Sequence, residues 1–258
     1  MNTENQQRNP VLLIHGIDDT EAVFYKMRAY LIQRGWSVYS LNLVPNNGDV
    51  ALDELAKQVA DYVTASFASE QRLDLVGFSM GGIVSRYYVQ RLGGINRVQR
   101  FITISSPHHG TVVAYASQRP GCMQMRPNSL FLKDLNSDAD MLRQLNFTSI
   151  WTPYDLMIVP ANSSQMPVGK EVVVPVSFHP WMLTDSKSLA VVTAALAERI
   201  QYSSDKARSP QPTPLAPLGE TPSPLASPLG RRPQWLPLKK LAQNGSISPF
   251  LRRIKGDL

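Results

Sequence analysis

A serine set between two glycines is the first feature of this chain that could do covalent chemistry. The pentapeptide at 77–81, GFSMG, reads G-x-S-x-G; a short apolar stretch precedes it, and a segment with apolar residues at helical spacing follows it. A chain that turns from strand into helix over so few residues strains the corner residue and exposes its hydroxyl above the sheet edge. The pattern therefore predicts Ser79 as a nucleophile.

A serine hydroxyl becomes a useful nucleophile when a histidine, itself oriented by a carboxylate, accepts its proton. His179 follows an apolar run at 170–178, and Asp155 follows another at 147–152. The order Ser79, Asp155, His179 is the order expected when the nucleophile occupies a strand-to-helix turn of a parallel sheet. We therefore predict Asp155 and His179 as the other two members of a catalytic triad.

Other acidic and imidazole side chains compete for these roles. Three aspartates lie in segments that have helical patterns, where solvated helix caps are their ordinary role: Asp134, Asp138 and Asp140. The remaining histidines are candidates for lining the site: His15, His108 and His109. The last two could equally well hydrogen-bond the loop at 105–111.

An attack on a carbonyl group creates an oxyanion, which needs preorganised N–H donors. The backbone N–H of Met80, directly after the serine, is one expected donor. The second is expected from the loop after the first strand, where Ile17 follows His15 and Gly16. Because both donors are backbone groups, we predict this oxyanion hole without regard to the side chains of these residues.

Apolar runs and helical patterns alternate along the chain. Strands are expected at 10–14, 36–43, 73–76, 98–105, 147–152 and 170–178, and helices at 20–34, 49–69, from the serine turn to about 92, and at 185–201. This alternation predicts an α/β fold, with a mostly parallel sheet of about six strands and helices on both faces. The candidate residues would then gather at the carboxyl ends of the strands.

Residues 110–146 interrupt the alternation with two short helical patterns, at about 128–136 and 138–146. This excursion over the strand ends is either a small cap beside the acyl pocket or an ordinary crossover with surface helices. Its apolar residues include Val112, Val113, Met123, Met125, Leu130, Phe131 and Leu132. Methionines and aromatics beside a nucleophile suit an acyl chain, which favours a lipidic or medium-chain ester as substrate.

The composition divides the chain of 258 residues into three parts. Residues 1–9 are expected to be a flexible N-terminus, 10–202 a catalytic domain, and 203–258 a disordered tail that holds half of the 20 prolines. The tail carries nine Lys and Arg against three Asp and Glu, so the whole net charge of +6 lies there. The domain is formally neutral, and we expect no nucleic-acid partner.

The tail is expected to be solvated, or alternatively to serve as a docking peptide or a weak contact with an anionic membrane surface. The single cysteine, Cys122, excludes an internal disulfide, and the polar N-terminus at 1–10 lacks the pattern of a secretory signal. We therefore expect a cytoplasmic protein. No metal-binding cluster or phosphate-binding loop is evident in the sequence, and no cofactor is expected.

Several short motifs resemble those of bacterial α/β-hydrolase lipases and esterases, including the compact Bacillus-type lipases. They are IHGI at 14–17, GFSMGG at 77–82, SSPHHGT at 105–111, YDLMIVP at 154–160 and the histidine after the last strand. The resemblance covers roughly 10–202 and implies an α/β-hydrolase fold that cleaves carboxylic esters through an acyl-enzyme. An acyltransferase or a thioesterase on the same triad is the alternative, and a catalytically inactive binding module is a third possibility.

Overall fold

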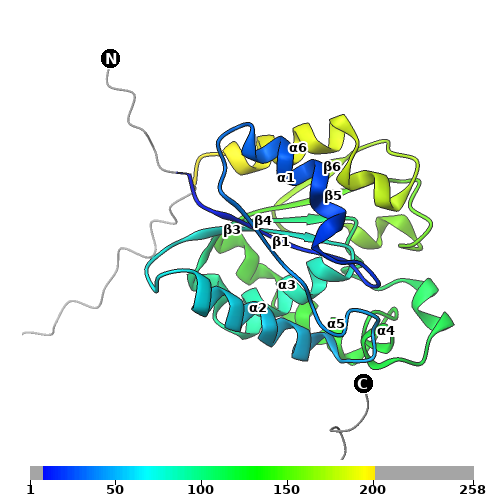
Figure 1. Ribbon diagram of the computed structural model, residues 1–258. Coiled ribbons are helices and arrows are strands. Elements are labelled where there is room, and N and C mark those ends of the chain that lie inside the picture. The colour runs from blue at the N-terminus through cyan, green and yellow to red at the C-terminus, as the bar shows by residue number, and fades with distance from the viewer. Residues whose placement is uncertain (1–7, 201–258) are drawn as a thin grey trace, which may run out of the picture. The chain divides into compact units, whose positions relative to one another are not determined.

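A computed structural model describes residues 8–200 of the chain. Its centre is a six-stranded sheet in the order β2-β1-β3-β4-β5-β6, and all five pairs of neighbouring strands are parallel. The strands are β1 (Val11–Ile14), β2 (Val38–Leu41), β3 (Leu73–Phe78), β4 (Val98–Ile104), β5 (Asn146–Trp151) and β6 (Lys170–Val173). The predicted α/β-hydrolase fold class, a parallel sheet with helices on both faces, is confirmed (Figure 1).

Helices cover both faces of this sheet. They are α1 (Tyr25–Ile32), α2 (Leu52–Ser66), α3 (Met80–Arg91), α4 (Pro120–Gln124), α5 (Leu130–Ser137) and α6 (Ser186–Ala197). Single turns of 3-10 helix join them at η1 (Glu21–Phe24), η2 (Gly94–Asn96), η3 (Val112–Ala116), η4 (Ala139–Gln144), η5 (Ala161–Ser164) and η6 (His179–Leu183). In Figure 1, α2 and α3 lie on one side of the sheet and α1 and α6 on the other.

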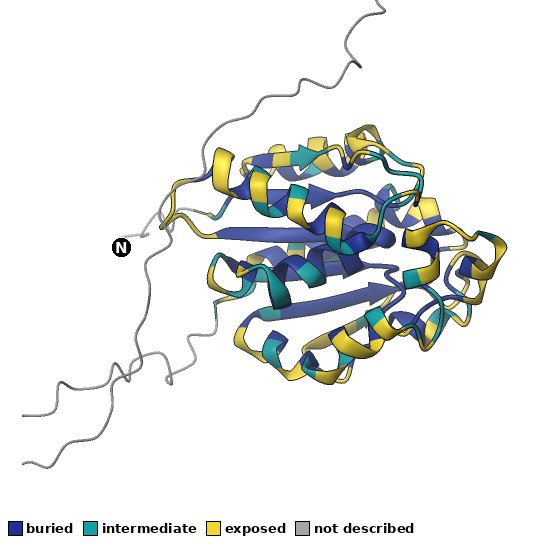
Figure 2. Ribbon diagram, turned by 90° about the horizontal axis from the view of Figure 1, so that it is seen from below, coloured by how far each residue is buried: buried dark blue, intermediate teal, exposed yellow. Residues whose placement is uncertain are grey.

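Two hydrophobic cores follow from the alternation of side chains along each strand. In β1, Leu12 and Ile14 pack with the residues of α2 and α3, whereas Val11 and Leu13 pack with those of α1 and α6. The middle strand β3 is buried along its whole length, and the exposed residues of the helices lie on their outer faces (Figure 2). A central strand buried on both faces gives the turn that follows it a rigid base.

Several predicted boundaries need correction. The sixth strand ends at Val173 rather than at 178, because Pro175 cannot donate a backbone hydrogen bond to a neighbouring strand. The predicted helix at 20–34 is divided into η1 and α1. The short helix α4 was not predicted, and the helical pattern at 138–146 stops at Gln144 because β5 begins two residues later. None of these changes alters the order of the strands.

The excursion at 110–146 is bonded to two neighbouring elements. Beside α2, the Gly121 N–H donates to the Gly48 carbonyl at 2.9 Å, and the Gln124 amide donates to Asp53 at 2.8 Å. On α3, Arg91 forms ion pairs with Asp134 at 2.9 Å and Asp138 at 2.6 Å. These contacts anchor the excursion to the segments on both sides of it.

Seven residues of the predicted N-terminal segment at 1–9 lie outside the described part of the chain. The predicted tail at 203–258 lies wholly outside it. Between residues 8 and 200, no helix has the length and apolar character that crossing a membrane requires.

Candidate active site

The turn between β3 and α3 holds Ser79 in a strained backbone conformation. Its φ of 53° and ψ of −124° lie outside the regions that residues with a side chain normally adopt. The glycines around it permit this turn: a Cβ on Gly77 would come within 2.5 Å of the Gly82 Cα, and one on Gly81 would overlap the Ile14 carbonyl. Strand, helix and the end of β1 therefore meet at Ser79 because these positions lack side chains.

His179 and Asp155 form a buried pair at the carboxyl ends of the last strands. The His179 Nδ1 lies 2.7 Å from the Asp155 Oδ2, as the order of the residues predicted. The other carboxylate oxygen accepts the N–H groups of Met157 and Ile158, each at 2.9 Å. Burial by itself would raise the pKa of Asp155, but the hydrogen bond from His179 and these two N–H groups outweigh it and hold the pKa below its ordinary value.

The pair lies beside the serine turn. The His179 ring packs against Phe78, the residue directly before Ser79, with 4.7 Å between the ring centroids. Because Asp155 occupies Nδ1, Nε2 is the nitrogen left for a proton from Ser79. Within residues 8–200, neither His179 Nε2 nor Ser79 Oγ has a hydrogen-bond partner, and the two do not bond each other. Catalytic hydrogen bonds are often long before substrate binds.

Two backbone N–H groups near Ser79 also have no acceptor in the described part of the chain. One is Met80, at the first position of α3, where the helix dipole adds positive potential. The other is Ile17, in the loop after β1. The ring of His15 donates from Nδ1 to the Gly16 carbonyl at 2.8 Å. In a trans peptide the C=O and N–H point in opposite directions, so this bond turns the Ile17 N–H away from His15.

The three rival aspartates do not lie against His179. Asp134 and Asp138 pair with Arg91, as described above, and Asp140 pairs with Arg143 at 2.8 Å. No group of three or more His, Cys, Asp or Glu residues is placed to hold a metal ion in the part of the chain that the structure covers.

Comparisons with known proteins show what the chain resembles in sequence and in fold. The sequence model of the palmitoyl protein thioesterase family matches residues 10–133. Two curated proteins named triacylglycerol lipase, from Pseudarthrobacter phenanthrenivorans and Burkholderia plantarii, are each 30% identical over 115 residues. That stretch is 42% of this chain and 35% and 32% of the relatives, so the chain spans about a third of their length.

Among solved structures, the mature form of Bacillus licheniformis lipase BlEst2 superposes with a TM-score of 0.62 at 14% identity, over 74% of this chain and 93% of that one. This chain has the α/β-hydrolase fold, and it resembles lipases in sequence. The resemblance inferred from the short motifs is thereby confirmed.

The other histidines of this α/β-hydrolase are occupied differently from His179. His15 is fully buried, and its Nε2 accepts the Leu43 N–H at 2.9 Å while Nδ1 donates to Gly16. Burial lowers the pKa of His15, which keeps the ring neutral, as these two bonds require. His15 therefore supports the loop after β1 and does not line the site with a free nitrogen.

His108 belongs to a buried polar network behind the site. Its Nε2 lies 2.9 Å from the Thr103 hydroxyl, and its Nδ1 faces Arg86 at 3.4 Å. Burial, followed by the charge of Arg86, lowers the pKa of His108 well below its ordinary value. His109 is exposed, and its Nδ1 lies 3.3 Å from the Ser163 carbonyl. Of the two open readings for this histidine pair, the structure favours support of the loop.

Sequence reasoning missed Arg86 and Asp19. Arg86 is fully buried on α3, and it donates to Asn136 at 2.9 Å and to the Leu135 carbonyl at 2.8 Å. Burial lowers its pKa to about 9. An arginine within a helix gives no sequence signal of burial, because only the packing of α5 on α3 encloses it.

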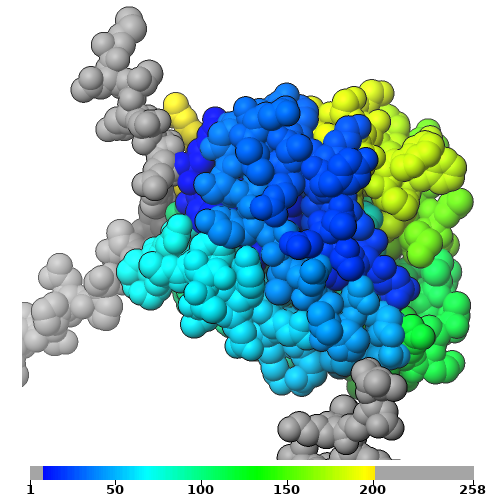
Figure 3. Space-filling view, viewed as in Figure 1, coloured from blue at the N-terminus to red at the C-terminus, as the bar shows by residue number. Residues whose placement is uncertain are grey.

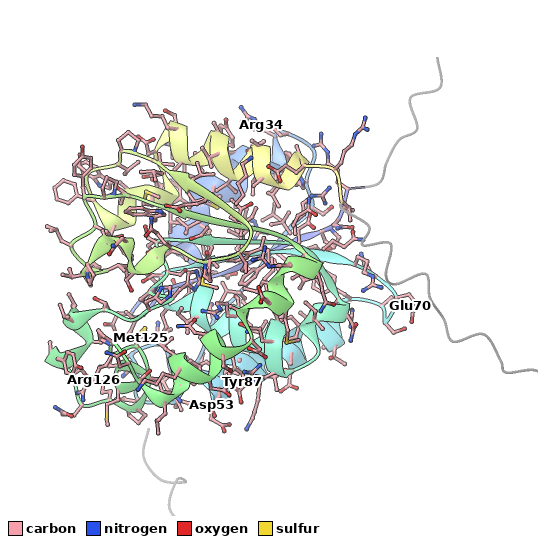
Figure 4. All side chains as sticks on the ribbon, turned by 180° about the vertical axis from the view of Figure 1, so that it is seen from behind. Arg34, Asp53, Glu70, Tyr87, Met125 and Arg126 are labelled. Carbon is pink, nitrogen blue, oxygen red and sulfur yellow. The ribbon has the colours of Figure 1, made fainter. Side chains whose placement is uncertain are left out.

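The surface near the site is apolar, although the excursion supplies only part of it. Val112, Val113, Met123 and Leu130 are exposed, whereas Met125 and Leu132 are buried in the core and Phe131 stacks on Tyr87. Further exposed apolar side chains come from the loops around Asp155 and His179: Tyr154, Leu156, Met157, Phe178 and Trp181. Figure 4 places Met125 and Arg126 at the end of the sheet opposite Glu70.

The excursion also borders the N-terminal third of the domain. In the space-filling view, the segment in blue meets the green excursion at the lower right (Figure 3). The contact is partly polar, because Arg119 donates to the Asn47 carbonyl at 2.8 Å and pairs with Asp49 at 3.1 Å.

Proposed function

We propose that this protein is a serine hydrolase that cleaves carboxylic esters through an acyl-enzyme on Ser79. One observation carries the proposal: a buried histidine, held at Nδ1 by a buried carboxylate, stands beside a strand-to-helix turn with Nε2 free. The other two buried histidines have both ring nitrogens engaged. Only His179 among these three can therefore accept a proton from the serine.

In the proposed reaction, Ser79 Oγ bonds to the ester carbonyl carbon while its proton passes to His179 Nε2. The Asp155 carboxylate stabilises the resulting imidazolium. The N–H groups of Met80 and Ile17 would receive the carbonyl oxygen as it becomes negative. The bond to the alcohol then breaks, and the alcohol leaves with the proton from His179. Water repeats the sequence on the acyl-enzyme and releases the acid.

The substrate proposed is an ester of a medium-chain or lipidic acid, because exposed apolar side chains surround the acid and the base. Each buried methylene contributes up to about 0.8 kcal/mol to binding, so kcat/KM should rise with acyl length until the pocket is full. The test is a series of p-nitrophenyl esters from two to eight carbons, with the Ser79→Ala protein as the blank. A flat or falling profile would reject a lipidic substrate.

A thioesterase is the second candidate, and the family match at 10–133 favours it. The triad chemistry is the same for both, and only the leaving atom differs. Matched oxygen and sulfur esters of one acid would separate the two activities through the ratio of kcat/KM. An acyltransferase would instead show a product that shifts from the free acid to a new ester when an alcohol is added.

A catalytically inactive binding module would leave Ser79 unreactive. A fluorophosphonate probe tests this directly, because it reacts with a serine only where a base has activated the hydroxyl. Labelling that disappears in Ser79→Ala would support the enzyme, and absence of labelling in the parent would support the binding module.

The anchoring of the excursion at 110–146 has a kinetic consequence for this function. Its hydrogen bonds beside α2 and its ion pairs to α3 oppose an opening movement at a lipid surface. We expect the rate on a short-chain ester to follow ordinary saturation, without a jump at the concentration where the substrate forms droplets. Such a jump would show that the excursion moves.

A further inference from the structure

Asp19 lies in the oxyanion loop, which we define as residues 15–19, and neither the triad nor the oxyanion hole uses its side chain. Its Oδ2 lies 3.0 Å from the position that a Cβ on Gly16 would take, and the Ser79 Cβ lies 3.1 Å from the same point. The Asp19 carboxylate and the Ser79 side chain are therefore separated only by the space that a methyl group at Gly16 would fill.

Two side chains lie against the backbone of Gly16. His15 donates to its carbonyl at 2.8 Å, as described above. The Asp19 Oδ2 lies 3.0 Å from the position of a Cβ on Gly16, and the Gly16 N–H contributes to lowering the pKa of that carboxyl. The Gly16 carbonyl belongs to the same peptide unit as the Ile17 N–H, so restraints on Gly16 also orient the predicted oxyanion donor.

The outer part of the loop is fixed independently of the Asp19 carboxylate. Asp18 has a φ of 57°, and its N–H donates to the Asn46 carbonyl at 2.9 Å. The Asn46 side chain in turn donates to the Asp19 carbonyl. The Asp19 backbone is therefore held by the segment after β2, and its carboxylate remains directed at Gly16.

The groups that act on the pKa of Asp19 include His179, the proposed base. The carboxyl is half-buried, and burial raises its pKa, while His15 and His179 oppose that rise, Asp18 adds to it and the Gly16 N–H opposes it. An ionised Asp19 thus lies in the field of the proposed base.

We propose that Asp19 is a positioning residue that holds Gly16, and with it the Ile17 N–H, against the nucleophile, and that its charge makes the site select against acyl groups that carry an anion. The proposal rests on the proposed function, because positioning here means positioning for attack on an ester. It assigns the site a substrate class: neutral or cationic acyl groups. Asp18, exposed and adjacent, offers a matched control with the same side chain.

The first experiment compares Asp19→Asn and Asp19→Ala with the control Asp18→Asn on a neutral and an anionic ester of equal length. p-Nitrophenyl pentanoate and mono-p-nitrophenyl glutarate serve, with the uncatalysed rates subtracted. Asp19→Asn should raise the kcat/KM of the glutarate relative to the pentanoate by about threefold to thirtyfold, as expected for one unit charge removed at this range. Asp18→Asn should leave that ratio close to the parent's.

Measurements of kcat and KM on the neutral ester distinguish a positioning role of Asp19 from a merely structural role. An asparagine oxygen can still accept the Gly16 N–H, whereas alanine cannot. Asp19→Ala should therefore lower kcat by about tenfold with KM little changed, as for a weakened oxyanion donor, and Asp19→Asn should recover most of that loss. A merely structural role would instead appear as equal losses in both variants that follow the fraction of folded protein.

A measurement without substrate keeps the two proposals distinguishable. Hydrogen exchange of the Gly16 amide should be faster in Asp19→Ala than in the parent, and unchanged in Asp18→Asn. If the parent hydrolyses no ester but the Gly16 amide responds in this way, the proposed function fails while the positioning of Gly16 stands. An unchanged glutarate-to-pentanoate ratio in Asp19→Asn, or an unchanged Gly16 exchange in Asp19→Ala, would overturn the proposal.

Discussion

The two ends of the sheet each hold a buried carboxylate paired with a basic side chain. At the carboxyl end, Asp155 bonds His179 at 2.7 Å; at the amino end, Asp74 on β3 bonds Arg100 on β4 at 3.0 Å. Asp74 also accepts from Asn9 at 2.9 Å, and Arg100 also donates to the Glu198 carbonyl, at 2.7 Å from Nη2. Both carboxylates are buried, so the burial of the acid does not distinguish the two pairs.

What distinguishes the two pairs is the hydrogen-bonding capacity left over. The amino-end pair is saturated by its neighbours and joins the N-terminal segment, two strands and the end of α6. The carboxyl-end pair leaves His179 Nε2 free beside Ser79 and two backbone N–H groups. A buried pair with unused donors and acceptors that face one another points to catalysis, whereas a saturated pair points to stability.

The largest expected effect is the loss of the nucleophile. Ser79→Ala should lower kcat/KM on a p-nitrophenyl ester by on the order of 10⁴-fold or more. The circular dichroism spectrum and melting temperature should stay close to the parent's, because the side chain makes no hydrogen bond that supports the fold. Activity within tenfold of the parent would reject Ser79.

The comparison between the two pairs is tested by making the same change in each. Asp155→Asn should lower kcat by about 10³- to 10⁴-fold, because the base loses the group that fixes its tautomer. Asp74→Asn should lower the free energy of unfolding, because the amide nitrogen that replaces one carboxylate oxygen cannot accept from Arg100, while kcat per folded molecule stays near the parent's. Kinetics and urea unfolding measure both quantities. Equal kinetic losses in the two variants would refute the distinction.

Substitution of His15 should have a smaller effect on kcat. His15→Asn should lower kcat by about tenfold to a hundredfold with KM little changed, because the Gly16–Ile17 peptide loses its restraint. His108→Asn is the matched control, since that ring is equally buried but bonds Thr103 and Arg86. It should lower the melting temperature and leave kcat per folded molecule nearly unchanged. A catalytic loss as large in His108→Asn would assign that network to the site.

The smallest expected effect is a difference in how stability depends on pH. The pKa of Asp155 is lowered, so its ionised form stabilises the fold above the ordinary aspartate pKa, and that contribution is lost as pH falls through the lowered value. Burial raises the pKa of Asp74 against the opposing charge of Arg100. The folded state therefore binds the Asp74 proton more tightly, and this contribution to stability grows as pH falls.

Unfolding free energies measured between about pH 3 and 6 test these signs. The advantage of the parent over Asp155→Asn should shrink towards low pH, and its advantage over Asp74→Asn should grow. Slopes of the same sign for both variants would contradict the two pKa directions.

Much of the architecture follows from local sequence patterns. The apolar runs before Ser79 and Asp155 bury as strands because they pack on both faces, and the glycine spacing at 77–81 permits the strained turn. The order of the proposed triad residues follows the order of the strands. The boundary of the last strand was predicted wrongly: its pairing with β5 ends at Val173, two residues before Pro175, although the apolar run continues.

The sequence by itself determined which residues could do chemistry and which elements would carry them, because composition and periodicity are local properties of the chain. Tertiary structure decided which of those residues keep a hydrogen-bonding atom without a partner. Four histidines look alike in the sequence, yet packing engages both ring nitrogens of His15 and His108 and leaves one nitrogen of His179 free. It also brought Asp19 beside Ser79, because the end of β1 meets the start of α3 only in the folded sheet, where parallel strands end at a common edge.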